Sequence, residues 1–216
     1  MMASGLFITL EGVEGSGKTT QAGLLAAGLR GRGYQVLATR EPGGTRAGDA
    51  IRGIFLDPAV ALQAEAELLL VLADRAQHVR EQLRPSLAQG MIVISDRYSD
   101  STIAYQGYGR GLDLRLLRQL NEFATGGTHP DRTIVLDCDA EDGLARTRQR
   151  MRGAERRPDR FEGENAEFHR LVRQGFLAIA RAEPDRVSVV DATRPITEVT
   201  AAIIAVVEPL AATRCP

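Results

Sequence analysis

The most constraining feature of this chain is the run GVEGSGKT at residues 12–19, which fits the pattern G-x-x-x-x-G-K-[ST]. An apolar run at 6–10 precedes it and predicts a buried strand, and residues 20–29 follow with a helical pattern. A strand, a glycine loop and a helix in this order are the context that a phosphate-binding loop requires. A glycine-rich turn with a chance lysine would lack that context, so the run predicts a nucleotide-binding α/β domain.

Each residue type in this loop suits phosphate binding. Glycine lets the backbone turn with its N–H groups pointing inward and no side chain in the way. These N–H groups and the positive end of the following helix form a seat for phosphate oxygens. Lys18 adds a charge for the terminal phosphates of ATP, and the Thr19 hydroxyl is placed to hold Mg²⁺. The predicted nucleotide-binding residues are Gly12, Val13, Glu14, Gly15, Ser16, Gly17, Lys18, Thr19 and Thr20.

Lys18 is the only lysine among the 27 basic residues of the chain, and all the others are arginines. A bias toward arginine acting around one constrained position accounts for this pattern. The pattern indicates that arginine does not serve at position 18, because a planar guanidinium and a flexible ammonium differ in geometry.

Length and composition favour one soluble domain spanning residues 1–216, with 44% apolar and 25% charged residues. The net charge of -1 gives no overall basic field for a nucleic acid or an anionic membrane. No apolar run reaches the ~20 residues of a membrane span, and the N-terminus lacks a signal-peptide pattern. The two cysteines, Cys138 and Cys215, have no metal-type neighbours and favour a reducing, cytoplasmic location.

Strand and helix patterns alternate along the rest of the chain. Because strands joined through helices run parallel, the alternation predicts an α/β fold with a parallel five-stranded sheet and helices on both faces. The C-terminal residues 211–216 are expected to be a frayed tail. Further strands are predicted at 34–39, 91–95, 133–136 and 187–190, and further helices at 46–55, 61–83, 112–123, 140–150, 165–182 and 196–207.

Charged residues follow the predicted strands at their carboxyl ends, where ligands bind in such sheets. Asp96 follows the strand at 91–95 and is predicted to help hold Mg²⁺ directly or through water, although an Asp here also suits the cap of the next helix. Arg97 is predicted to bind a phosphate or to neutralise charge on a transferring phosphoryl group. The alternative for Arg97 is a surface arginine paired with a nearby acid.

An arginine-rich segment at 146–160 has no apolar face and is interrupted by Gly153 and Pro158. Such a segment buries little, so we expect a mobile lid at about 146–163 that closes over nucleotide phosphates. The alternative is a solvated helix and loop whose arginines pair with the acids of 155–164. The arginines are Arg146, Arg148, Arg150, Arg152, Arg156, Arg157 and Arg160.

Taken together, these motifs resemble the thymidylate kinase family, whose members make dTDP from dTMP and ATP. The resemblance covers nearly the whole chain, and its most specific elements are REPGGT at 40–45 and DRY at 96–98. It implies a P-loop nucleoside-monophosphate-kinase-like fold, the use of ATP and Mg²⁺, and a homodimer with the helix around Leu69 as a candidate interface. The other matching segments are FITLEG at 7–12, ADRAQH at 73–78, STIAYQG at 101–107, DRFE at 159–162 and DAT at 191–193.

The resemblance also assigns site residues by position. Glu14 stands where the family has a carboxylate near the 3′-hydroxyl of dTMP, and Gly15 stands where some members have arginine. In such bacterial-type members the lid supplies the catalytic arginine, for which Arg150 and Arg152 are the candidates. The implied catalytic residues are Lys18, Glu14, Arg97, Arg150 and Arg152. The implied dTMP-binding residues are Arg40, Arg75, Arg97, Ser101, Thr102, Tyr105 and Gln106, and the implied metal ligands are Thr19 and Asp96.

One position departs from the family pattern. Four residues before Arg75, where the family usually has a phenylalanine stacked on thymine, this chain has Val71. A valine offers no flat aromatic face. Either the base rests on aliphatic side chains, or selectivity for thymine is looser.

The acceptor of such a kinase is already anionic, so transfer of the γ-phosphoryl group needs positioning and charge neutralisation rather than a strong base. The nearest alternative is a deoxynucleoside kinase, which needs a base aimed at a 5′-hydroxyl. The match at 40–42 and the short arginine-rich lid speak against it, and an adenylate kinase has a different loop and a larger lid. From another class, a nucleotide-dependent switch would bind ATP or GTP without a second nucleotide site.

Overall fold

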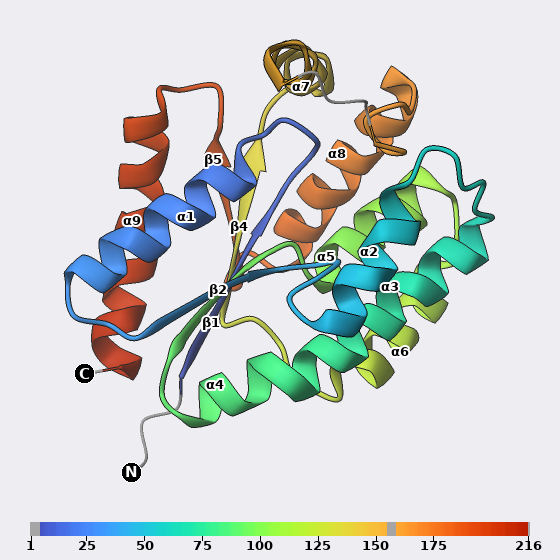
Figure 1. The fold of residues 1–216 in the computed structure, drawn as a ribbon. Coiled ribbons are helices and arrows are strands. Elements are labelled where there is room, and N and C mark those ends of the chain that lie inside the picture. Colours follow the sequence, from blue (N-terminus) through green and yellow to red (C-terminus); the bar gives the residue numbers. More distant parts are fainter. Residues whose placement is uncertain (1–4, 155–158, 216) are drawn as a thin grey trace.

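Five parallel strands form one sheet at the centre of the fold, in the order β2-β3-β1-β4-β5 (Figure 1). This computed structural model describes residues 5–154 and 159–215, without the side chains of 150–154. The predicted α/β fold with a five-stranded parallel sheet is confirmed. The strands are β1 (Leu6–Glu11), β2 (Val36–Arg40), β3 (Ile92–Asp96), β4 (Arg132–Asp137) and β5 (Val187–Asp191).

The central position of β1 explains its apolar composition. It pairs with β3 on one side and β4 on the other, and all of its residues are buried. A strand with helices on both faces needs apolar side chains on both. This explains why residues 6–10 are apolar except for Thr9. The same pairing places Leu10 opposite Asp96, so the loop that follows β1 and the acid that ends β3 lie at one edge of the sheet.

Helices cover both faces of the sheet (Figure 1). α1 (Lys18–Gly31) and α9 (Ile196–Arg214) pack against each other on one face, and α8 (Ala166–Ala182) packs on β4 and β5 from the other. The remaining helices are α2 (Arg46–Leu56), α3 (Ala64–His78), α4 (Arg84–Ala88), α5 (Ser99–Thr102), α6 (Leu114–Thr125) and α7 (Ala140–Ala154), with π-helical segments η1 (Val79–Leu83) and η2 (Ile103–Gly109).

The long helix predicted at 61–83 is present, but its hydrogen-bond pattern changes along its length. It begins at Ala64 as α3, widens into η1 and continues as α4. Pro85 explains the change, because proline has no N–H with which to extend the α-helical ladder. A second π-helical segment, η2, follows α5 in a stretch for which no element was predicted, and it carries Tyr105 and Gln106.

The expectation of a frayed tail at 211–216 is wrong for the described residues. α9 continues to Arg214, and Ala211 is fully buried. Val199, Ile203 and Ala211 are spaced by four and eight residues and so form one apolar face, in a helix that packs against α1 and the sheet. The helical period therefore extends beyond its predicted end.

α9 is long and apolar enough to cross a membrane by length and composition alone, with a mean hydropathy of 1.6. It is the one such helix in the described part of the chain. A single helix of this kind is weak support for a membrane span, because core helices of soluble proteins meet the same criterion and α9 packs against α1, β1 and β5.

Candidate active site

The loop after β1, residues 12–17, turns tightly on glycines with left-handed φ angles. Gly12 has a φ of 141° and Gly15 a φ of 74°, which side chains disfavour. Gly15 also lies against the first turn of α7, where an added Cβ would be 1.9 Å from the Gly143 carbonyl oxygen. Glycine at position 15 therefore lets the helix that leads toward the predicted lid approach the loop.

The Lys18 side chain is folded into this loop. Its Nζ donates to the Val13 carbonyl oxygen at 2.8 Å and to Ser16 Oγ at 3.3 Å, and the residue is buried. Burial, followed by the nearby Arg97 charge, lowers the pKa of Lys18 to about 8. The ammonium thus lies among backbone groups suited to phosphate, and phosphate oxygens would favour its charged form.

The two predicted metal ligands lie in contact. Thr19 Oγ1 donates to Asp96 Oδ2 at 2.5 Å, across the edge of the sheet where the loop meets β3. A hydroxyl and a carboxylate are oxygen donors of the kind that Mg²⁺ prefers, and Mg²⁺ usually completes its shell with waters and substrate phosphates. In the described part of the chain, no group of three or more His, Cys, Asp or Glu side chains gathers as an all-protein metal site. The donor set therefore fits a metal that binds together with a nucleotide.

Arg97 lies at the centre of a polar cluster between the loop and η2. Its guanidinium donates to the Gly12 carbonyl oxygen at 3.1 Å, to Ser101 Oγ at 3.1 Å and to the Tyr105 hydroxyl at 2.9 Å. It also pairs with Glu14 Oε1 at 2.5 Å. The side chain is only 15% exposed, so Arg97 is not a surface arginine. Its φ of 75° is strained for a residue with a side chain, which is typical of functional positions.

Glu14 is ionised in this cluster. Burial alone would raise its pKa, but the charges of Arg97 and Lys18, with a hydrogen bond from Tyr105, lower the pKa to about 2. Burial raises the pKa of Tyr105 well above its ordinary value, so the phenol stays protonated and donates to Glu14 at 3.0 Å. The cluster therefore presents a fixed carboxylate beside a fixed guanidinium, which suits a ligand that carries both a hydroxyl and a phosphate.

Glu11, which was not among the candidates from sequence, holds the residues that follow Arg97. Its carboxyl accepts a hydrogen bond from the Tyr98 N–H at 2.8 Å and another from the Ser101 hydroxyl at 2.6 Å. Burial, followed by the nearby charge of Asp100, raises the pKa of Glu11 to about 8. The sequence signal that could have found it is a glutamate ending an otherwise apolar buried strand, directly before the loop.

We expect Glu11→Ala to weaken acceptor binding through Arg97. Without the carboxyl, the Tyr98 N–H and the Ser101 hydroxyl lose their acceptor, which costs about 1–3 kcal/mol per unsatisfied group. Glu11→Gln keeps an acceptor oxygen and is the matched control. The Michaelis constant for the acceptor should rise in Glu11→Ala and stay near wild type in Glu11→Gln. Equal constants in all three proteins would rule out a positioning role.

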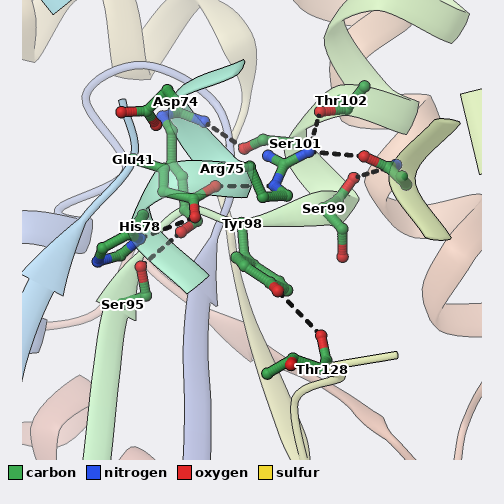
Figure 2. Close-up of polar contacts among 12 residues, drawn as sticks. Glu41, Asp74, Arg75, His78, Ser95, Tyr98, Ser99, Ser101, Thr102 and Thr128 are labelled. Carbon is green, nitrogen blue, oxygen red and sulfur yellow. Dashed lines mark hydrogen bonds and ion pairs between the residues drawn. The ribbon is translucent and has the colours of Figure 1, made fainter. Parts of the chain in front are cut away.

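Arg75 is buried and held on several sides (Figure 2). It is 2% exposed, and its Nε donates to Glu41 Oε2 at 2.9 Å. Its Nη1 donates to Thr102 Oγ1 at 2.8 Å and to Asn121 Oδ1 at 2.6 Å, and the guanidinium lies 5.2 Å from the centre of the Tyr98 ring. No described residue accepts from its Nη2, which leaves one donor for a ligand in the cavity that Arg75 lines.

Glu41 joins the turn after β2 to α3 (Figure 2). One carboxylate oxygen accepts from Arg75 and the other lies 2.9 Å from His78 Nδ1. Asp74, from the same helix, accepts from the Gly43 N–H at 2.9 Å. The REPGGT and ADRAQH segments singled out in the sequence are therefore packed against each other, which fixes this turn beside the cavity.

Two cavities meet at the Arg97 cluster. The first, the phosphate-loop cavity, includes Lys18, Thr19 and Asp96. The second, the acceptor cavity, includes Arg75 and, from η2, Tyr105 and Gln106. Both are bounded by Glu14, Glu41, Arg52, Arg97 and Asp159.

The acceptor cavity gathers most of the residues implied for dTMP. Arg40 lines the adjoining phosphate-loop cavity, 3.6 Å from Asp49, and its place beside the acceptor stays a prediction. The side chains of Arg150 and Arg152 lie outside the described residues. The implied residues that line the acceptor cavity are Arg75, Arg97, Ser101, Thr102, Tyr105 and Gln106.

Arg160, expected in the mobile lid, is anchored. Its N–H donates to the Leu56 carbonyl oxygen at 3.1 Å and its Nε to the Phe55 carbonyl oxygen at 3.0 Å. Its Nη1 pairs at 2.6 Å with Glu67, which is fully buried and also accepts from Gln106. The predicted lid therefore ends at a segment that is fixed to α2 and α3.

Several cavity residues were missed from the sequence. Glu41, Asp159 and Phe161 lie inside the motifs REPGGT and DRFE, so membership of those motifs was a usable signal. Arg52 and Phe55 lie in α2 outside any motif, and only the packing of α2 against α3 brings them to the cavity.

Comparison with known proteins distinguishes among the nucleotide kinases. Residues 10–203 match the profile of the family described as thymidylate kinase. The chain belongs to the thymidylate kinase family. A thymidylate kinase of Deinococcus radiodurans is 54% identical over 95% of this chain and 98% of that protein. One of Synechococcus sp. (strain JA-2-3B'a(2-13)) is 53% identical over 94% of this chain and 95% of its own length.

Solved structures agree with this membership of the thymidylate kinase family. The crystal structure of thymidylate kinase from Ehrlichia chaffeensis is similar to this chain with a TM-score of 0.77 and 38% identity. The match covers 95% of this chain and 99% of that one. The predicted family, fold and enzyme class, a phosphotransferase of the thymidylate kinase family, are confirmed, and the family implies the use of ATP.

Proposed function

We propose that this enzyme transfers the γ-phosphoryl group of MgATP to the phosphate of dTMP, giving dTDP and ADP in the synthesis of dTTP. The observation that carries the proposal is the meeting of the two cavities at Glu14 and Arg97. One cavity contains the loop suited to ATP phosphates, and the other contains the motifs implied for dTMP. Donor and acceptor phosphates would then face each other beside Arg97, and direct transfer between them requires that proximity.

Different residues of the two cavities would bind the ATP phosphates, the dTMP phosphate, the sugar and the base. Lys18 and the loop N–H groups would bind the terminal phosphates of ATP. Arg97 would hold the dTMP phosphate, and Arg52, which bounds both cavities, is placed to assist it. Glu14 would accept a hydrogen bond from the 3′-hydroxyl of the sugar, and the remaining donor of Arg75 would meet the base.

Thr19 and Asp96 would hold Mg²⁺, and their contact and oxygen donors support that assignment. When bound, Mg²⁺ neutralises negative charge on the phosphates of ATP. Arg150 and Arg152 remain the candidates for the lid arginine that neutralises the transferring group. The close approach of α7 to the loop at Gly143 supports a lid that follows this helix.

The proposal predicts that dTMP alone raises the melting temperature, because a ligand that binds only the folded state stabilises it by about 2.7 kcal/mol at 100 times its Kd. Thymidine, which lacks the phosphate that Arg97 would bind, should give a smaller shift. A nucleotide-dependent switch would respond to ATP or GTP but not to dTMP. No shift with millimolar dTMP would contradict the acceptor assignment.

We also propose that the enzyme is a homodimer. Large apolar side chains are exposed on α2, α3 and α6, and α3 packs against both of the others (Figure 1). Leu69 is 62% exposed and Phe123 85%, and large apolar side chains exposed on neighbouring helices are candidates for an interface. The exposed apolar residues on these helices are Ile54, Leu69, Leu116 and Phe123.

Leu69→Glu is expected to convert the dimer to a monomer, because a charge buried without a partner opposes association. The molar mass measured by light scattering should halve. Leu24→Glu is the matched control, since Leu24 is also exposed but lies on α1, and it should leave the mass unchanged. A Leu69→Glu protein that keeps the dimer mass would contradict this interface.

We place the enzyme in the cytoplasm. Both cysteines, Cys138 and Cys215, are free thiols, as a reducing compartment allows. The relatives described above are bacterial proteins.

A further inference from the structure

The acceptor cavity has an apolar part that the polar cluster does not use. Phe55, Leu56, Val71 and Phe161 line it, and Phe55, Val71 and Phe161 are buried. Under the proposed function, the phosphate of the acceptor lies at Arg97. The flat, weakly polar base therefore falls to this apolar part of the same cavity.

The two aromatic rings of the apolar part differ in how completely they are already packed. Phe161 meets the Tyr105 ring edge-on at 5.4 Å and the Phe168 ring at 6.3 Å, and it lies beneath the Arg160 guanidinium at 4.7 Å. Phe55 has fewer ring contacts. Among the aromatic rings and guanidinium groups of the described residues, its ring meets Phe161, at 5.1 Å, and Arg160, at 5.2 Å. Phe55 therefore lines the cavity with fewer aromatic partners than Phe161, which makes it the better candidate to contact a ligand.

Phe55 is also held firmly enough to serve as a wall. Arg160 donates to its carbonyl oxygen and lies over its ring, while Nη1 of the same arginine is fixed by the buried Glu67. Glu67 is held in turn by Arg110 at 3.1 Å. A ring whose position is already fixed by such contacts loses little side-chain entropy when a ligand binds, which favours its use in ligand recognition.

We propose that Phe55 supplies the aromatic face on which the acceptor base rests, and that it makes up for the valine at position 71. Both residues line the same cavity from neighbouring helices, Phe55 from α2 and Val71 from α3. A ring on either helix offers the flat contact that a base prefers, and a valine on one leaves room for a ring on the other. The inference rests on the proposed function, and it replaces both alternatives that the sequence left open at Val71.

The chain has no tryptophan, which allows a direct binding test. Phe55→Trp places a single indole at the proposed wall, and Ile196→Trp places one on a 59% exposed site of α9, away from both cavities, as a matched control. Titration with dTMP in the absence of ATP should change the indole emission of Phe55→Trp by about a third or more. The emission of Ile196→Trp should stay constant.

Phe55→Leu tests whether the Phe55 ring contacts the base without introducing the larger indole, which could distort the cavity. Loss of the ring should raise the Kd and KM for dTMP about three- to tenfold, with the KM for ATP within twofold of wild type. Phe55→Leu with Val71→Phe should recover at least half of that loss. An unchanged Kd for dTMP in Phe55→Leu would overturn the inference. Wild-type protein without dTMP-dependent turnover would instead contradict the proposed function itself.

Discussion

Replacing Lys18 with alanine is expected to lower kcat for dTDP formation about 10³-fold and to leave the fold intact. Among the described residues, Lys18 Nζ donates to Val13 and Ser16 of the loop, so a nucleotide phosphate can take over its donors. Removing one donor aimed at developing charge costs about 2.7–4 kcal/mol of transition-state stabilisation. The melting temperature should not fall, because the variant no longer buries a cation.

The matched control is Lys18→Arg, which keeps the charge and changes its shape. A guanidinium is longer and planar, so it cannot reproduce the contacts of the folded-back ammonium with Val13 and Ser16, and this variant should be nearly as impaired as Lys18→Ala. Steady-state kinetics with dTMP and ATP, together with thermal melts, measure both effects. A Lys18→Ala protein with more than a tenth of wild-type kcat would contradict the assigned role.

Arg97→Ala is expected to lower kcat/KM for dTMP by about 10³-fold, with the KM for ATP nearly unchanged. The guanidinium joins Gly12, Glu14, Ser101 and Tyr105. Its loss would remove the proposed donor to the dTMP phosphate and break the hydrogen bonds that link the loop to the residues after β3. The variant should also melt at a lower temperature, because Glu14 is left buried without its partner. Assays well below that temperature separate the kinetic loss from unfolding.

A pH series checks this coupling independently of catalysis. In the wild type the pKa of Glu14 is lowered from 4.5 to about 2, with the Arg97 charge as the largest lowering cause against burial. A lowered folded-state pKa contributes stability above about pH 4.5, and that contribution is lost as pH falls toward 2. The difference in unfolding free energy between wild type and Arg97→Ala should therefore shrink over that interval. A difference in unfolding free energy that stays constant with pH would show that Arg97 does not lower the pKa of Glu14.

Most of the fold was predictable because its signals are local. The apolar run at 6–10, the glycine loop and the alternation of strands and helices each report on neighbouring residues, and the five-stranded parallel sheet follows from them. The end of α9 was missed because the apolar period at Ala211 lies beyond the strongest part of the pattern. The change to a π-helix before Pro85 depends on a backbone donor that proline lacks rather than on any hydrophobic pattern.

The candidate site was predictable only where a motif named its residues. Arg75 and Arg97 lie within motifs, and the structure places both in one cavity. Glu67 and Phe55 carry no motif, and their contacts with Arg160 join residues about a hundred positions apart. Packing between residues so far apart in the chain produces no local sequence pattern, so the anchoring of residues 159–162 could not be predicted from the sequence.

Transfer of the γ-phosphoryl group to dTMP is tested by measuring ADP formation from MgATP with dTMP, dUMP, dCMP, dAMP and thymidine offered separately. We expect rapid turnover with dTMP, clear preference for it over the other monophosphates, and none with thymidine, whose uncharged 5′-hydroxyl leaves Arg97 without a phosphate. Turnover with thymidine alone would move the enzyme to the nucleoside kinases. ADP formation that does not depend on any acceptor would contradict the claim that the second cavity binds a nucleotide.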